Sequence, residues 1–195
     1  MALFRTTSFA ESVPAIEGDG VVLRTPQMMD FAEWAQLREQ SRDFLTPWEP
    51  IWPVDDLTRA AFRRRLRRYN EDARNDLAYA FFVFRQSDDA LVGGLTLANV
   101  RRGVAQAGSL GYWMGAPYAR QGYMTRAVQA LIPFAFGPLR LHRLEAACIP
   151  TNAASNHLLE KCGFVREGLA RRYLCINGLW QDHFLYALLI GDPRP

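Results

Sequence analysis

Residues 112–125 read YWMGAPYARQGYMT, and this stretch decides the fold. An apolar segment leads into a loop with Gly115 and Gly122, and apolar residues at helical spacing follow. The order predicts a strand, a loop and a helix over Gly122–Phe136. Unpaired N–H groups and the positive dipole end of such a helix suit a phosphate or pyrophosphate. Glycines that only form a tight turn explain the same residues equally well. The Lys-Ser/Thr pair of a Walker loop and the three spaced glycines of a dinucleotide fingerprint are both missing.

Apolar periodicity on either side of this stretch predicts alternating strands and helices. Strands are expected at Val21–Arg24, Tyr79–Arg85, Leu91–Val100, Ala107–Met114 and Leu141–Ile149, helices at Met29–Gln40, Leu57–Ala73 and Asn152–Cys162, and an ordered loop at Arg42–Pro53. Phe164–Leu189 predicts two more strands, joined at Asn177-Gly178, which is a strong hairpin signal. Pro133 predicts a kink or an early end of the helix that contains it.

The chain length predicts one domain. At 195 residues, with 49% hydrophobic and 22% charged residues, the composition is that of a globular protein. We expect a flexible leader over residues 1–19 and a single domain over residues 20–190. The class is α/β (α+β), with a mixed sheet flanked by helices.

The basic residues are concentrated on one predicted helix. The net charge is only +3, yet six arginines lie in this helix: Arg59, Arg63, Arg64, Arg65, Arg67 and Arg68. They form a solvated face, guide an acidic peptide or contact ribosomal RNA, and the sequence leaves all three open.

The cysteines and the apolar segments bear on the cellular location. Cys148, Cys162 and Cys175 are odd in number and form no C-x-x-C pair, so we expect neither disulfides nor a metal site. No secretory signal is evident, and no apolar run approaches about 18 residues. We expect a cytoplasmic protein.

Three motifs together resemble a known family. They are ARQGYMTRA at 119–127, NAASNHLLEKCGF at 152–164 and RYLCINGLWQDH at 172–183. In this order they resemble GNAT acetyltransferases, and within them the RimJ/RimL-type ribosomal-protein N-terminal acetyltransferases. FLTPWEP at 44–50 resembles that subgroup too, and the resemblance extends over roughly residues 21–190.

The resemblance implies a GNAT fold and a site for acetyl-CoA. The sheet would be mostly antiparallel and splayed between the strands at Gly111–Met114 and Leu141–Ile149, with pantetheine in the splay. The residues implied to contact acetyl-CoA are Trp113 and Met114 through main-chain atoms, the amides of Arg120, Gln121, Gly122, Tyr123, Met124 and Thr125, and, toward the thiol, Asn152 and Asn156. Those expected to contact the acceptor are Trp48, Glu49, Tyr112, Tyr173 and Trp180.

The chain departs from the family at the catalytic positions. Leu159 stands where many relatives have a tyrosine acid, and the strand at 108–112 lacks their glutamate. Ser155 is therefore the expected partner of the CoA thiolate, although it also suits a first helical turn. Glu49 and Glu145 are the expected bases through water, with Asp182 behind them. A loop hydrogen bond for Glu49 and a salt bridge for Glu145 are the alternatives.

The remaining reactive side chains are expected to be structural. Cys148 and Cys162 lack a spaced His and acid, so we interpret them as core thiols. We interpret His183 as a core or surface histidine rather than as a catalyst.

The predicted reaction is direct acetyl transfer to an amine without a covalent enzyme intermediate. A terminal α-amine has a pKa near about 8, against about 10.4 for lysine, so a site without a strong base suits a protein N-terminus, and specifically that of a ribosomal protein. A small-molecule amine as acceptor is the first alternative. An RNA-binding module is the second, although the basic helix lacks interleaved stacking aromatics.

Overall fold

The computed structural model describes residues 13–193 and contains an eight-stranded sheet. The strands are β1 (Ile16–Gly18), β2 (Val21–Arg24), β3 (Tyr79–Arg85), β4 (Leu91–Arg101), β5 (Ala107–Met114), β6 (Arg143–Cys148), β7 (Val165–Ile176) and β8 (Leu179–Leu189). They lie in the order β1-β2-β3-β4-β5-β6-β8-β7. The β5–β6 pair is parallel and the other neighbouring pairs are antiparallel. The predicted mixed, mostly antiparallel sheet is therefore confirmed.

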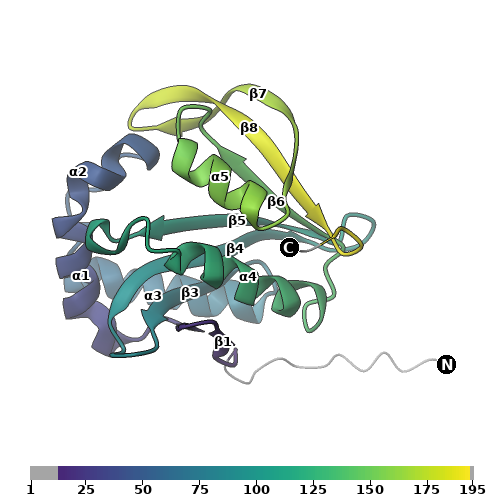
Figure 1. The fold of residues 1–195 in the computed structure, drawn as a ribbon. Helices are drawn as coiled ribbons and strands as arrows, with labels where there is room; N and C mark the ends of the chain where they lie inside the picture. Colours follow the sequence, from purple (N-terminus) through teal and green to yellow (C-terminus); the bar gives the residue numbers. More distant parts are fainter. Residues whose placement is uncertain (1–12, 194–195) are drawn as a thin grey trace.

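Helices cover both faces of the sheet (Figure 1). They are α1 (Phe31–Gln40), α2 (Arg42–Leu45), α3 (Arg59–Arg74), α4 (Tyr123–Phe136) and α5 (Ala153–Lys161), with short 3-10 turns η1 (Met28–Asp30), η2 (Thr46–Trp48) and η3 (Ala116–Tyr118). In Figure 1, α4 and α5 lie in front of the sheet and α3 lies behind it. The sheet is thus the middle layer of three.

Each face of the sheet has its own apolar core. In front, Val128 and Leu131 of α4 and Leu159 of α5 are buried with apolar side chains of the sheet. Behind, Trp34 of α1 and Phe62 of α3 stack with ring centroids 4.7 Å apart, within a cluster that includes side chains of β3. The apolar spacing of each helix predicted which face it would bury.

Three sequence predictions need correction. The expected leader contains β1, which pairs with β2, while its residues 1–12 lie outside the described part. The loop predicted at Arg42–Pro53 begins with α2 and η2. Pro133 does not end α4 early, because the helix continues to Phe136 with Pro133 on its exposed side.

The β7–β8 hairpin forms at the predicted dipeptide. Asn177 has φ 46° and Gly178 has φ 79°, the pair of positive values that a tight two-residue hairpin turn requires. This turn also contacts the loop after η2, because the Asn177 amide donates to the Glu49 carbonyl oxygen at 2.9 Å. The hairpin turn is therefore held against the segment that carries Glu49.

Candidate active site

The pairing of β5 with β6 stops halfway along β5. Its last pair is Leu110 with Ala146, so 111–114 and 147–148 diverge. On its other side β5 stays paired with β4 through Met114. The divergence opens a cavity of about 950 Å³, lined by both strands and by residues of α2, α4, α5, β7 and β8. The expected splay is confirmed.

The start of α4 lies at one end of this cavity. Gly122 has φ 80° and precedes the helix, and no side chain caps this end. The first helical donor is the Arg126 amide, which binds the Gly122 carbonyl at 3.1 Å, so the amides of 123–125 come before the helical bonding begins. Arg120, Gly122, Tyr123, Met124 and Thr125 line the cavity. Unpaired amides, the helix dipole and Arg120 together suit an anion.

The loop before α4 is fixed from the opposite side of the sheet. The Ser41 hydroxyl, fully buried after α1, accepts a hydrogen bond from the Ala116 amide at 2.9 Å. The Gln121 side chain donates to the Pro117 carbonyl at 3.0 Å and does not line the cavity. Gln121 therefore shapes the loop rather than facing the cavity with its side chain.

A hydroxyl pair lies in the middle of the cavity. The Tyr112 and Ser155 hydroxyls are 2.7 Å apart, and both residues line the cavity. Asn152 caps α5, its side chain accepting from the Ser155 amide at 3.1 Å. Burial raises the pKa of Tyr112 well above its ordinary value, while the bond with Ser155 acts the other way, so the phenol stays protonated as a donor. Sequence reasoning had placed Tyr112 on the acceptor side only.

Several predicted site residues do not line the cavity. The Asn156 amide donates to the carbonyls of Ile149, Pro150 and Asn152, and its oxygen accepts from Tyr186. Asn156 therefore supports the loop into α5. Tyr173 and Trp180 are 49% and 66% exposed on the β7–β8 hairpin, outside the cavity lining.

Glu145 is separated from the cavity as well. Its side chain forms ion pairs with Arg101 and, at 3.0 Å, with Arg143. It is absent from the cavity lining, whereas the adjacent Ala146 lines it. These ion pairs favour the salt-bridge interpretation of Glu145 over the expected role as a base.

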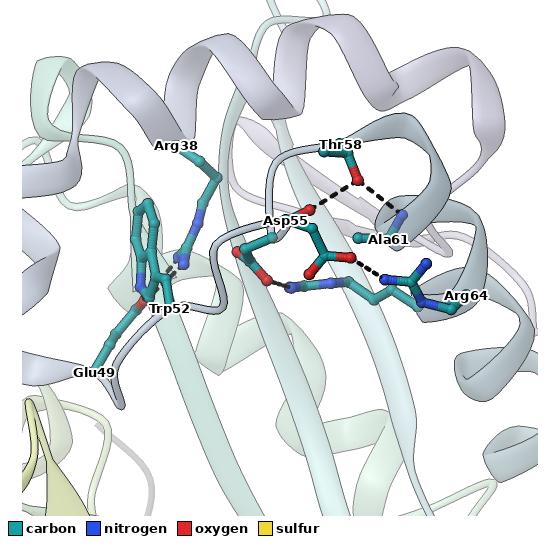
Figure 2. A network of polar contacts seen from close by, with 9 residues as sticks. Arg38, Glu49, Trp52, Asp55, Thr58, Ala61 and Arg64 are labelled. Carbon is teal, nitrogen blue, oxygen red and sulfur yellow. Dashed lines mark hydrogen bonds and ion pairs between the residues drawn. The ribbon is translucent and has the colours of Figure 1, made fainter.

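Glu49 lines the cavity, but its carboxylate is committed to a buried network (Figure 2). Arg38 donates to both of its oxygens at 2.7 Å, and Trp52 Nε1 donates at 2.7 Å. The Arg38 guanidinium also lies 4.0 Å from the Trp52 ring centroid and 5.0 Å from that of Trp113 on β5. This network connects α1, the loop after η2 and the splayed strand.

The cavity also contains residues that sequence reasoning left out. They are Phe44, Leu45, Tyr118, Cys148, His157, Lys161, Leu174, Ile176 and His183, among others. Burial raises the pKa of Cys148 above its ordinary value, so this thiol is protonated near neutral pH. The two acceptor-side motifs, at 44–50 and 172–183, indicated which segments line the cavity. They did not indicate which of their side chains would be buried.

The arginine-rich helix α3 does not contribute to the cavity. Arg64 pairs with Asp55 and Arg65 with Asp56 (Figure 2 shows the first pair), while Arg63 and Arg67 are exposed and form no ion pair with any described residue. Its charge is thus partly neutralised and lies on the back of the sheet. Among residues 13–193, no helix is long and apolar enough to cross a membrane, and no cluster of His, Cys, Asp and Glu suits a metal ion.

A sheet splayed between two parallel strands, with a glycine-led helix at one end of the gap, defines the N-acetyltransferase class of α/β folds. The family described as "Acetyltransferase (GNAT) domain" matches residues 21–165. The chain belongs to the GNAT acetyltransferase family.

Known proteins and solved structures resemble nearly the whole chain. The probable N-acetyltransferase YjcK of Bacillus subtilis is 36% identical, over 91% of this chain and 98% of its own. The [ribosomal protein uS5]-alanine N-acetyltransferase of Escherichia coli is 32% identical, over 96% and 97%. The solved Mycobacterium smegmatis RimJ, in complex with CoA-disulfide, is 30% identical with a TM-score of 0.85, over 94% of this chain and 89% of its own. The expected membership is confirmed.

The Arg38 network generates a prediction about stability. Arg38→Leu should lower the free energy of unfolding by about 2–4 kcal/mol, because it leaves the partly buried Glu49 carboxylate without its counter-charge. Urea unfolding measures this change. The matched control is Glu39→Gln, which breaks the exposed Arg42–Glu39 pair and should change stability little. Equal effects of the two substitutions would contradict a structural role for the network.

Proposed function

We propose that the protein transfers the acetyl group of acetyl-CoA to an amine, specifically the N-terminal α-amine of a ribosomal protein. The observation that carries the proposal is the splay cavity, with the free amides of α4 at one end and the Tyr112–Ser155 pair in the middle. Relatives that include the uS5-alanine N-acetyltransferase and the RimJ solved with CoA-disulfide support both the proposed donor and the proposed acceptor.

The cavity fits the chemistry of acetyl-CoA. Beyond Leu110 and Ala146 the two strands no longer pair with each other, so their facing main-chain groups are free for the amides of a pantetheine arm. The amides of 123–125 and Arg120 suit the pyrophosphate, and Trp113 and Met114 lie on the strand along which the arm would extend. Lys161 at the end of α5 also lines the cavity and adds positive charge for phosphate.

The reaction we propose is direct. The neutral amine attacks the thioester carbonyl carbon, the C–N bond forms, the C–S bond breaks, and the thiolate takes a proton to leave as CoA. Tyr112 and Ser155 are the groups placed to donate a hydrogen bond or that proton to the sulfur, and Leu159 cannot take part. Because a thioester is already activated, orientation and proton transfer are the enzyme's main tasks.

The acceptor would enter from the side of α2 and the β7–β8 hairpin. Phe44, Trp48, Leu174 and Ile176 line this part of the cavity, and the bond from Asn177 to Glu49 joins its two walls. The three free cysteines support a reducing compartment such as the cytoplasm, where ribosomal proteins are made. Charge alone supports a contact between the exposed arginines of α3 and ribosomal RNA, and a solvated face accounts for them equally.

The acceptor is tested with matched amines. A short peptide with a free alanine or serine terminus should be acetylated faster than the same peptide blocked at that terminus but carrying lysine. The side-chain amine of lysine has a pKa about two units higher than that of a terminal amine, so its deprotonation costs about 3 kcal/mol more. A polyamine and an amino sugar represent the small-molecule alternative. Comparable rates on the two peptides, or a faster small molecule, would contradict the terminal-amine acceptor.

The hydroxyl pair is tested by removing each partner. Ser155→Ala and Tyr112→Phe should each lower kcat about tenfold or more, while the Kd for acetyl-CoA changes less than about threefold, because the hydrogen bond to sulfur strengthens as charge develops. The double variant should lose little more than either single one, since the two hydroxyls act through one hydrogen bond. Unchanged kcat in both single variants would remove the pair from the mechanism.

A further inference from the structure

His183 is a buried histidine on the wall of the cavity. It lies on β8 immediately before Phe184, and Phe184 opposite Cys148 is the last pair between β8 and β6. The residue is 2% exposed and lines the cavity together with Glu49 and Ile176. It therefore lies where β6 ends and the gap between the strands is open.

The hydrogen bond of the His183 ring determines which nitrogen carries the proton. Nδ1 lies 2.9 Å from the carbonyl oxygen of Gln181. A carbonyl oxygen only accepts, so Nδ1–H is the donor and the neutral ring leaves Nε2 unprotonated. Nε2 forms no hydrogen bond with any residue of 13–193. A neutral imidazole with a free Nε2 is a proton acceptor near pH 7.

Strand alternation places His183 and the hydroxyl pair on opposite faces of the sheet. Tyr186 of β8 bonds Asn156 of α5, and Phe184 packs with the same core, so these side chains face α5. His183 alternates with Phe184 and faces the other way, toward the side of α1 and α2. Tyr112 faces α5, where it bonds Ser155. The splay connects the two faces.

This arrangement matches the two proton transfers of the reaction. The base must reach the attacking nitrogen and the acid must reach the departing sulfur, so the two groups need separate positions around the gap. Glu49 is the other acceptor group near His183, and its oxygens already accept three hydrogen bonds from Arg38 and Trp52. His183 retains a free acceptor atom.

We propose that His183 is the general base, taking a proton from the acceptor amine at Nε2. The inference rests on the proposed acetyl transfer and names the residue that removes the amine proton at neutral pH. As the neutral amine forms the C–N bond, its nitrogen becomes positively charged and loses a proton to Nε2, which gives an imidazolium. The C–S bond breaks, and the thiolate takes a proton from the Tyr112–Ser155 pair. The imidazolium then releases its proton to solvent, and the pair regains one from solvent. Nδ1–H stays on the Gln181 carbonyl throughout.

Several polar and aromatic groups lie around His183. The Tyr173 ring contacts it edge to face with centroids 5.9 Å apart, and Asp182 beside it accepts from the Arg172 amide. Glu49, bound to Arg38, lines the same cavity, and so does Cys148, whose thiol faces α5 and donates to the Asn152 carbonyl. The other cavity histidine, His157, is on α5.

The test compares kcat/KM for one acceptor peptide between pH 6.5 and 9. His183→Asn keeps an N–H for the Gln181 carbonyl but lacks Nε2, and it should lower kcat/KM at pH 7 about a hundredfold with an unchanged Kd for acetyl-CoA. The deficit should shrink toward pH 9, where hydroxide takes the proton of the attacking nitrogen in place of Nε2. Imidazole added to the solution should raise the rate of the His183→Ala variant. The matched control is His142→Asn, at an exposed histidine outside the cavity.

Each outcome has a separate meaning. A His183→Asn rate within threefold of wild type at pH 7, or a deficit that is constant with pH and not relieved by imidazole, overturns the assignment. If wild type fails on the terminal-amine peptide but acetylates lysine or a polyamine, the proposed acceptor is wrong, and the same comparison on that amine decides His183. Wild type that acetylates no amine overturns both.

Discussion

The end of hydrogen bonding between β5 and β6, at Leu110 and Ala146, is the constraint on which the rest of the structure depends. Where the two parallel strands diverge, their main-chain donors and acceptors face a gap. Buried N–H and C=O groups need hydrogen-bond partners. β4 holds the free half of β5 from its other side, so the strand stays extended while one edge remains open. A ligand rich in amides can satisfy that edge.

The surrounding elements keep the gap from collapsing. Ser41 holds the loop before α4, and the Arg38 guanidinium lies against Trp113 on the diverging strand while it binds Glu49. The Asn177 amide ties the β7–β8 turn to the same loop. Each contact joins segments that are distant in sequence, so the shape of the cavity is a property of the whole sheet. Proton chemistry can then be divided between the faces, with Tyr112 and Ser155 on one and His183 on the other.

Local sequence signals predicted much of this architecture. Apolar periodicity located the strands and helices within a few residues, and Asn177-Gly178 and Gly122 take the positive φ values that their neighbours require. The splay itself followed from the family resemblance rather than from periodicity. What the sequence left open depended on contacts across the fold: Glu49 and Glu145 were each either a base or a structural partner, and the structure binds one to Arg38 and the other to Arg143. The burial of His183 and the exposure of Trp180 follow from where the hairpin closes, which a single sequence does not encode locally.

The most direct test of the account is calorimetric titration of acetyl-CoA into the wild-type protein and into Gly122→Asp. Nothing lies within 4 Å of a Cβ added at Gly122, so the substitution causes no clash. Its φ of 80° is strained for a residue with a side chain, and a carboxylate beside the free amides would repel the pyrophosphate. The account predicts one site per chain with a micromolar Kd and a raised Tm for wild type, and a Kd weakened severely in Gly122→Asp. The absence of heat and of a Tm shift at millimolar acetyl-CoA in the wild-type protein would contradict it.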